Sequence, residues 1–293
     1  MTAREWPLVV FTLLVQIGVG FFLAFPLPLI LSGDRPEARF MLLISLAGVL
    51  IVLAAAGALS LFHLGNPLKA YRTLGNLGRS WLSREIFFLL LTSGLLAGLF
   101  FLEWTRAGSQ GTFVALSVAA ALAGVSLILS MANIYRLEAV PAWDSPMTPF
   151  SFLMTAFVLG ALGSAAISAF ELLSEGEGTA PFAGRLPMNA AALALLVLNF
   201  AGVFLFDPNF GIRRIGRRGI EREPSRVLIR LHKLRLAFIL SAVAAVVPMI
   251  PARSPLASSS LVRPLLIYAF VAALVSETLG RVLFYALFRK EGL

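Results

Sequence analysis

Residues Leu61–Ile86 read LFHLGNPLKAYRTLGNLGRSWLSREI, a polar stretch that lies between two long apolar segments. The stretch contains His63, one of only two histidines in the chain, and Glu85, a carboxylate where the next apolar segment begins. A short charged stretch between segments of membrane-spanning length is typical of a loop at a membrane surface. It also carries four basic residues, which are Lys69, Arg72, Arg79 and Arg84.

The composition of the whole chain is that of a membrane protein. Hydrophobic residues make up 59% of the 293 residues and charged residues only 13%, with a mean hydropathy of +0.89. Soluble domains average about 45–50% apolar and about 25% charged residues. The sequence contains no sizeable hydrophilic domain, so we predict a single integral-membrane domain over residues 1–293.

Eight apolar segments are long enough to cross a bilayer, because a hydrocarbon core of about 30 Å needs about 20 helical residues. The predicted fold class is therefore all-α, an integral membrane bundle of eight transmembrane helices. The predicted spans are residues 6–31, 40–62, 84–103, 112–135, 149–173, 188–206, 227–250 and 262–288.

The Lys and Arg residues are distributed unevenly between the two sides of this predicted bundle. An even number of spans puts both termini on one side, together with the Leu61–Ile86 stretch and the basic cluster Arg213–Arg226. The loops on that side carry more than twice as many Lys and Arg residues as the opposite loops. The positive-inside rule then places both termini in the cytoplasm, in a multi-pass protein of the cytoplasmic membrane. The same rule explains the net charge of +9, because the basic residues determine the topology. The Arg213–Arg226 cluster can also contact anionic membrane lipid, and we predict no nucleic acid as partner.

The residue types also exclude several redox groups from the chain itself. Cysteine is absent, so the protein can hold no iron–sulfur cluster of the usual thiolate kind and no disulfide. A haem with two histidine ligands would need both His63 and His232, which the predicted spans place near one surface. We therefore predict no haem and no metal site.

Polar residues on the predicted cytoplasmic side are the candidates for chemistry. Histidine titrates near neutral pH, so His63 can pass a proton, and Glu85 can lead protons out to water. The competing interpretations are a hydrogen bond from His63 to a loop carbonyl and, for Trp143, an ordinary aromatic residue at the membrane interface. The other candidates on this side are Arg72, Tyr135, Arg136, His232 and Arg235.

In the last predicted span Glu277, Arg281 and Tyr285 are four residues apart and therefore share one helix face. Ionisable groups at membrane depth are costly and usually face a partner or a water-filled path. Glu277 and Arg281 can form an ion pair that fixes the helix. The functional alternative is that Arg281 orients a carboxylate or that Glu277 relays a proton.

Several short motifs, in the same order over nearly the whole chain, resemble those of the anchor subunit of the dimethyl sulfoxide reductase family. No single motif is diagnostic, and the resemblance depends on the set. The motifs are Glu5-Trp6-Pro7-Leu8, His63-Leu64-Gly65-Asn66-Pro67 with Ala70, Ser83-Arg84-Glu85-Ile86, Tyr135-Arg136, Val140-Pro141-Ala142-Trp143 with Thr148-Pro149, and Glu277-Thr278-Leu279-Gly280-Arg281 with Phe284-Tyr285.

The resemblance implies a three-subunit oxidoreductase complex. The catalytic subunit holds molybdopterin, a ferredoxin-like subunit holds four iron–sulfur clusters, and the anchor has eight spans, no haem and a quinol site. The histidine and glutamate that the family ties to quinol oxidation fall on His63 and Glu85. We therefore expect menaquinone or ubiquinone to bind among His63, Arg72, Glu85, Tyr135, Arg136, Trp143, Arg281 and Tyr285.

The terminal substrate and the direction of electron flow stay open. Some anchors of the family have their termini outside, whereas the loop charges here place them inside. The related cytoplasm-facing sulfite-oxidising complexes use a similar anchor and send electrons into quinone. Two other functions compete with the quinone-reactive anchor, namely a purely structural anchor and a secondary transporter with an ion path through Glu277, Arg281 and His63. The missing inverted repeat argues against the transporter.

Overall fold

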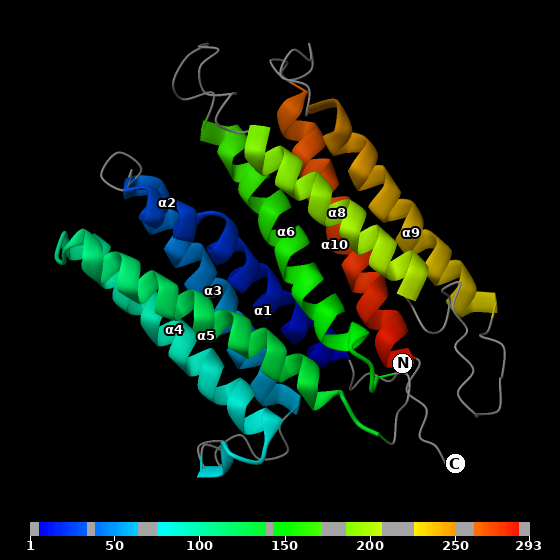
Figure 1. Ribbon diagram of the computed structural model, residues 1–293, viewed down its shortest axis with the longest axis horizontal. Helices are drawn as coiled ribbons and strands as arrows, with labels where there is room; N and C mark the ends of the chain where they lie inside the picture. The colour runs from blue at the N-terminus through cyan, green and yellow to red at the C-terminus, as the bar shows by residue number, and fades with distance from the viewer. Residues whose placement is uncertain are drawn as a thin grey trace. The chain divides into compact units, whose positions relative to one another are not determined.

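The computed structural model describes residues 6–33, 39–63, 75–138, 143–171, 186–206, 226–249 and 261–286. All regular secondary structure in these ranges is helical, which confirms the all-α fold class (Figure 1). The main elements are α1 (Trp6–Ala24), α2 (Pro26–Ser32), α3 (Arg39–His63), α4 (Trp81–Thr105), α5 (Gln110–Ile134), α6 (Met147–Glu171), α8 (Leu186–Phe206), α9 (Arg226–Val246), the 3-10 helix η2 (Val247–Met249) and α10 (Val262–Ala286).

Seven helical segments of the described ranges are long and apolar enough to cross a membrane, and α1 with α2 counts as one of them. The protein is therefore a multi-span membrane protein. The helix α8 is apolar as well, but the surroundings of its side chains are described only for residues 190–204. The predicted sixth span, residues 188–206, which corresponds to α8, therefore depends on the sequence pattern.

Pro26 divides the first predicted span into α1 and α2. Proline has no N–H to donate, and its ring disfavours the helical conformation of the preceding residue. Phe25 accordingly has φ −124°, although its N–H still donates to the carbonyl oxygen of Phe21 at 3.0 Å. The segment ends at Ser32, after which Gly33 takes the left-handed φ of 83° that is common beyond a helix end.

Capping serines move two helix starts away from their predicted positions. The hydroxyl oxygen of Ser80 accepts a hydrogen bond from the N–H of Ser83 at 3.3 Å, so α4 begins at Trp81. Ser109 caps α5 by accepting from the N–H of Thr112 at 3.2 Å, so α5 begins at residue 110. The predicted starts at residues 84 and 112 lie two or three residues after the observed ones. They were chosen from where the apolar residues begin, whereas the capping residue determines where the first helical turn begins.

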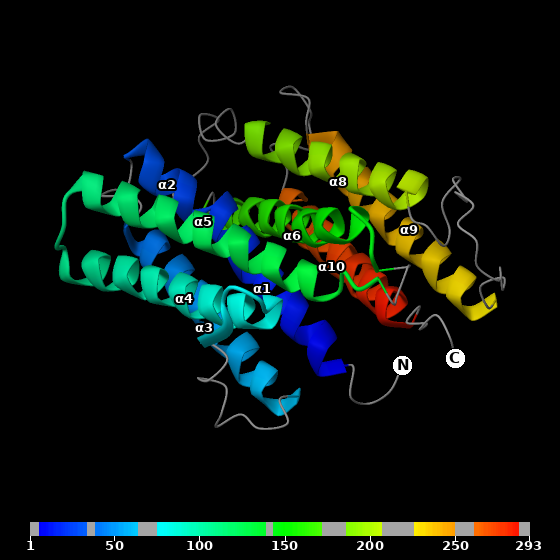
Figure 2. The same cartoon turned by 60° about the horizontal axis from the view of Figure 1, so that its bottom comes forward.

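The helices form two compact units. The N-terminal unit comprises residues 2–138 and 148–160, and the C-terminal unit comprises residues 139–147 and 161–293. In the N-terminal unit α4 packs along α5 and α3, and α3 packs along α1 (Figures 1 and 2). In the C-terminal unit α9 packs along α10 and α8. The single membrane domain expected from the composition stays a prediction.

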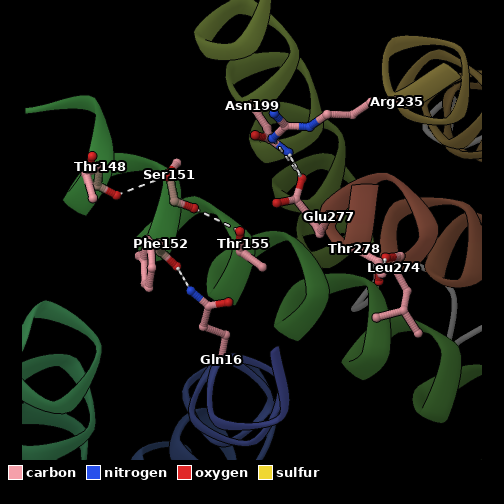
Figure 3. Close-up of polar contacts among 10 residues, drawn as sticks. All are labelled: Gln16, Thr148, Ser151, Phe152, Thr155, Asn199, Arg235, Leu274, Glu277 and Thr278. Carbon is pink, nitrogen blue, oxygen red and sulfur yellow. Dashed lines mark hydrogen bonds and ion pairs between the residues drawn. The ribbon is translucent and has the colours of Figure 1, made fainter. Parts of the chain in front are cut away.

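In the N-terminal unit α1 and α6 cross at glycines. A Cβ atom on Gly20 would overlap the carbonyl oxygen of Ala156, and a Cβ atom on Gly160 would overlap the carbonyl of Gly20. Backbones that meet in this way need residues without side chains at the contact. One turn away, Nε2 of the fully buried Gln16 donates to the carbonyl oxygen of Phe152 at 3.1 Å, which joins the same two helices (Figure 3).

Gly94 and Gly98 make a GxxxG motif in α4, a spacing that permits close helix approach. A Cβ atom on either glycine would meet no atom within 4 Å in the described part of the chain. The close contact is instead made by glycines on two different helices, which spacing within one helix does not reveal.

We expect Gly160→Ala to lower the midpoint of thermal unfolding of the purified protein in a mild detergent. The added methyl group forces α1 and α6 apart, and overpacking of this kind costs about 1–3 kcal/mol. Gly94→Ala is the matched control, because the same change is made in open space. It should keep or raise the midpoint, since alanine favours a helix over glycine by about 1 kcal/mol. Equal midpoints for the two variants would contradict the crossing.

Candidate functional site

The turn before α4 is built around Arg84. Its Nε and Nη2 donate to the carbonyl oxygens of Leu77 at 2.8 Å and Gly78 at 2.9 Å. Its guanidinium carbon lies 4.1 Å from the ring centroid of Trp81, which is cation–π distance. Arg84 therefore holds the turn against the first residues of the helix, whereas the neighbouring Glu85 takes no part in these contacts.

Glu85 is a buried carboxylate near the start of α4, with an exposed fraction of 7%. It makes no hydrogen bond or ion pair within the described part of the chain. Glu103, near the other end of α4, shows the contrast, because its Oε1 lies 3.2 Å from Nε of Arg39 in an ion pair. Burial of a charged group without a partner is costly. Glu85 therefore differs from a carboxylate that is buried as part of a structural ion pair.

The end of α3 and the end of α5 lie at the end of the N-terminal unit where α4 begins (Figures 1 and 2). His63 is the last residue of α3, and its side chain lies outside the described residues. Tyr135 follows α5, with its ring centroid 5.9 Å from that of Phe152, and Arg136 beside it is exposed. The helix connections therefore bring the backbone positions of His63, Glu85 and Tyr135 to one end of this unit.

Trp143 and Tyr285 are brought together in the C-terminal unit. Nε1–H of Trp143 donates to the carbonyl oxygen of Phe284 at 2.8 Å, and the two rings stack with centroids 5.1 Å apart. The ring of Tyr285 meets Trp143 edge-on at 6.2 Å. The indole therefore satisfies a carbonyl in the last turn of α10 and fastens the segment before α6 to that helix. This contact is structural, and a quinone contact of Trp143 stays a prediction.

Glu277 of α10 connects three helices (Figure 3). Its Oε1 accepts a hydrogen bond from Nδ2 of Asn199 on α8 at 2.9 Å and lies 3.8 Å from Nη2 of Arg235 on α9. All three side chains are buried, with Glu277 only 3% exposed. Arg281, the partner expected from spacing, lies one turn along α10 and is buried too. Through its contacts with α8 and α9, Glu277 joins α10 to two other helices, which a partner on α10 itself would not do.

Gly280 leaves the room that Arg235 needs. A Cβ atom on Gly280 would lie 2.7 Å from Cζ of Arg235, so the guanidinium rests against the backbone of α10. Neither the role of Asn199 nor the contact of Arg235 with Glu277 was expected from the sequence. The sequence does show that Asn199 and Arg235 lie within apolar segments, where polar side chains usually find a partner. The identity of that partner depends on which helices are neighbours.

The predicted quinone contacts divide between the two units. The N-terminal unit holds His63, Arg72, Glu85, Tyr135 and Arg136, and the C-terminal unit holds Trp143, Arg281 and Tyr285. Arg72 lies outside the described residues. Within the described ranges, no group of three or more His, Asp or Glu residues could hold a metal ion. The end of the N-terminal unit offers a histidine and a buried acid, two groups able to exchange protons.

Known proteins are similar to this one, one of them over nearly its full length and another over about half of it. The family model described as DMSO reductase anchor subunit (DmsC) matches residues 1–287. A component of the anaerobic dimethyl sulfoxide reductase of Escherichia coli (strain K12) is 28% identical over an alignment of 302 positions, and the match covers 99% of this protein and 97% of the relative. A component of the sulfite dehydrogenase of Allochromatium vinosum is 29% identical over an alignment of 174 positions, and the match covers 54% of this protein and 53% of the relative.

Among solved structures, one polypeptide in the structure of bd oxidase from Geobacillus thermodenitrificans has a similar fold. The TM-score is 0.70 at 14% sequence identity, and the match covers 96% of this protein and 84% of the other polypeptide. At this identity the likeness concerns the fold alone.

Glu277→Leu should strongly destabilise the protein, because Arg235 then stays charged and buried without its carboxylate. Breaking one side of a buried pair costs about 3–5 kcal/mol, whereas apolar replacement of both sides is often neutral. We therefore expect Arg235→Met with Glu277→Leu to have a higher unfolding midpoint than Glu277→Leu alone. The measurement is thermal unfolding in detergent of the wild type, both single variants and the double variant. A double variant no more stable than Glu277→Leu would argue against the pair.

Proposed function

Because this protein belongs to the DMSO reductase anchor subunit (DmsC) family, we propose that it exchanges electrons and protons between a membrane quinone and a molybdopterin oxidoreductase. The proposed partners are a ferredoxin-like subunit with four iron–sulfur clusters and a molybdopterin catalytic subunit. Menaquinone or ubiquinone is the proposed ligand of the anchor itself.

The main support for this proposal is the environment of Glu85. It is a buried carboxylate close to a helix end, without an ion pair or hydrogen bond in the described part of the chain. Oxidation of a quinol releases two electrons and two protons, so the site needs groups that lead protons to water. Glu85 is suited to that step, and His63 at the end of α3 is the proposed hydrogen-bond partner of a quinone oxygen.

The electrons must leave through the partner, because the anchor has no cysteine with which to hold an iron–sulfur cluster. A quinone therefore has to bind within tunnelling distance of the partner's nearest cluster. We therefore propose that the quinone site and the surface that binds the iron–sulfur subunit lie at the same end of the N-terminal unit. Arg72, Tyr135 and Arg136 are proposed to complete the site, whereas Trp143, Arg281 and Tyr285 remain predictions from the sequence.

The direction of electron flow follows from the partner complex. One similar protein is named as part of a reductase and another as part of a dehydrogenase. The proposal therefore includes quinol oxidation that feeds a reductase and quinone reduction by a dehydrogenase. The same proton-carrying groups serve both directions, since each step is the reverse of the other.

We also propose eight spans, with α8 as the sixth, in the cytoplasmic membrane with both termini in the cytoplasm. The apolar composition of α8 and its length of 21 residues support the count. The excess of Lys and Arg in the loops on the side of the termini supports the orientation.

His63→Ala and Glu85→Gln should each lower quinol-linked turnover of the assembled complex by about 10²–10⁴-fold, the usual contribution of a proton-transferring side chain. Assembly and turnover with a reduced dye that donates to the catalytic subunits directly should stay normal. The measurement compares the two electron donors in the same membrane preparation.

Glu103→Gln is the matched control for the carboxylate, because Glu103 is also buried on α4 but pairs with Arg39. We expect this variant to keep quinol-linked turnover while it loses some thermal stability. Normal quinol-linked turnover in His63→Ala and Glu85→Gln would leave a purely structural anchor as the better interpretation.

A tag fused after Leu293 should be reached by an impermeant labelling reagent only after the cells are opened. A second tag in the predicted outer loop between the first two spans, residues 34–38, should be labelled in intact cells. Labelling of the C-terminal tag in intact cells would reverse the proposed orientation.

A further inference from the structure

The helix α9 carries three cations on the side that faces away from its helical neighbours. Arg226, Arg230 and Lys233 are exposed, and spacings of four and three residues put them on one side of the helix. We call these three residues the basic stripe. The opposite side packs toward α10 and α8 with its buried residues, which are His232, Arg235, Ile239, Ala242, Ala245 and Val246.

The side of α9 that carries the basic stripe continues as an apolar surface. The exposed residues that follow on it are Ala237, Leu240, Ala244 and, in η2, Val247. A helix rises 1.5 Å per residue, so Leu240 lies about 10 Å beyond Lys233. Positive charge at one end and an apolar strip beside it match the headgroup and acyl chain of an anionic phospholipid.

The charge of the basic stripe has no counterpart in the described part of the chain. The first turn of α9 contains no acidic residue, and a helix N-terminus is itself partly positive. None of the three cations makes a hydrogen bond or ion pair within the described ranges. The preceding segment, residues 207–225, has five arginines against one aspartate and two glutamates, so it adds positive charge.

We propose that the basic stripe binds the phosphate headgroup of an anionic phospholipid, whose acyl chain lies along the apolar residues of the same helix side. Arginine suits this ligand because its guanidinium can donate two parallel hydrogen bonds to phosphate oxygens. Each basic residue near a membrane surface strengthens the binding of anionic lipid about fivefold. The site lies in the C-terminal unit and does not depend on the proposed quinone exchange.

The test is native mass spectrometry of the full-length protein, purified with its copurifying subunits and titrated with phosphatidylglycerol or phosphatidylcholine. The wild type should prefer phosphatidylglycerol. Arg230→Gln should weaken phosphatidylglycerol binding about fivefold, and the triple change Arg226→Gln, Arg230→Gln and Lys233→Gln about 100-fold. Binding of phosphatidylcholine should not change. Arg230→Lys should keep most of the preference, since it keeps the charge.

Arg79→Gln is the matched control, because it removes one exposed arginine from the turn before α4, away from α9. Equal losses in Arg79→Gln and Arg230→Gln would overturn the proposal, since net charge alone would then explain the effect. An unchanged preference in the triple variant would overturn it as well. A triple variant that keeps the lipid but loses its copurifying subunits would identify the basic stripe as a protein-docking surface instead.

Discussion

The hydrocarbon core of a membrane offers no water to the peptide groups, and this constraint determines the structure. Each N–H and C=O at that depth must be satisfied within the protein, which long helices do from their own backbone. The bend at Pro26 respects the constraint, because Phe25 still donates to Phe21 although it leaves the helical conformation. The hydroxyl groups of Ser80 and Ser109 cap α4 and α5 at their first turns, where backbone N–H groups have no carbonyl partner within the helix.

The same constraint applies to buried polar side chains, several of which have a hydrogen-bond or ion-pair partner on another helix. Gln16 gives an N–H to the α6 backbone, Glu103 pairs with Arg39, and Glu277 joins three helices, so each of them stabilises helix packing. Glu85 is buried to a similar degree and has no such contact in the described ranges. A buried carboxylate that stabilises no packing contact is the kind that a ligand or a proton can use. Glu85 is therefore distinguished from Glu103 and Glu277 by its lack of a partner in the described ranges and not by its burial.

Features that depend on one segment could be predicted from the sequence, and features that depend on neighbouring helices could not. Apolar length located seven of the predicted spans, because it is a property of a single segment. The division of the first span at Pro26 was not predicted, although proline is likewise a local signal. Gly94 and Gly98 have the spacing for close packing but face open space, whereas Gly20 and Gly160 make the contact from separate helices. The backbone positions of His63 and Glu85 lie at one end of the N-terminal unit because α3 ends on the side where the next helix, α4, begins. The partners of Glu277 required the packing of α8, α9 and α10, which no spacing rule supplies.

A quinone-reactive anchor without a redox centre of its own is constrained in where it can work. Electrons must reach a partner outside the bilayer and protons must reach water, so both have the shortest path at a helix end. Glu85 lies about 6 Å along α4 from Trp81, close to such an end. Gly20, in contrast, lies about 20 Å along α1 from Trp6, at membrane depth, where α1 and α6 touch. The proposed exchange of electrons and protons therefore fits the end of the N-terminal unit, whereas the contact between Gly20 and α6 lies at a depth where helices pack closely.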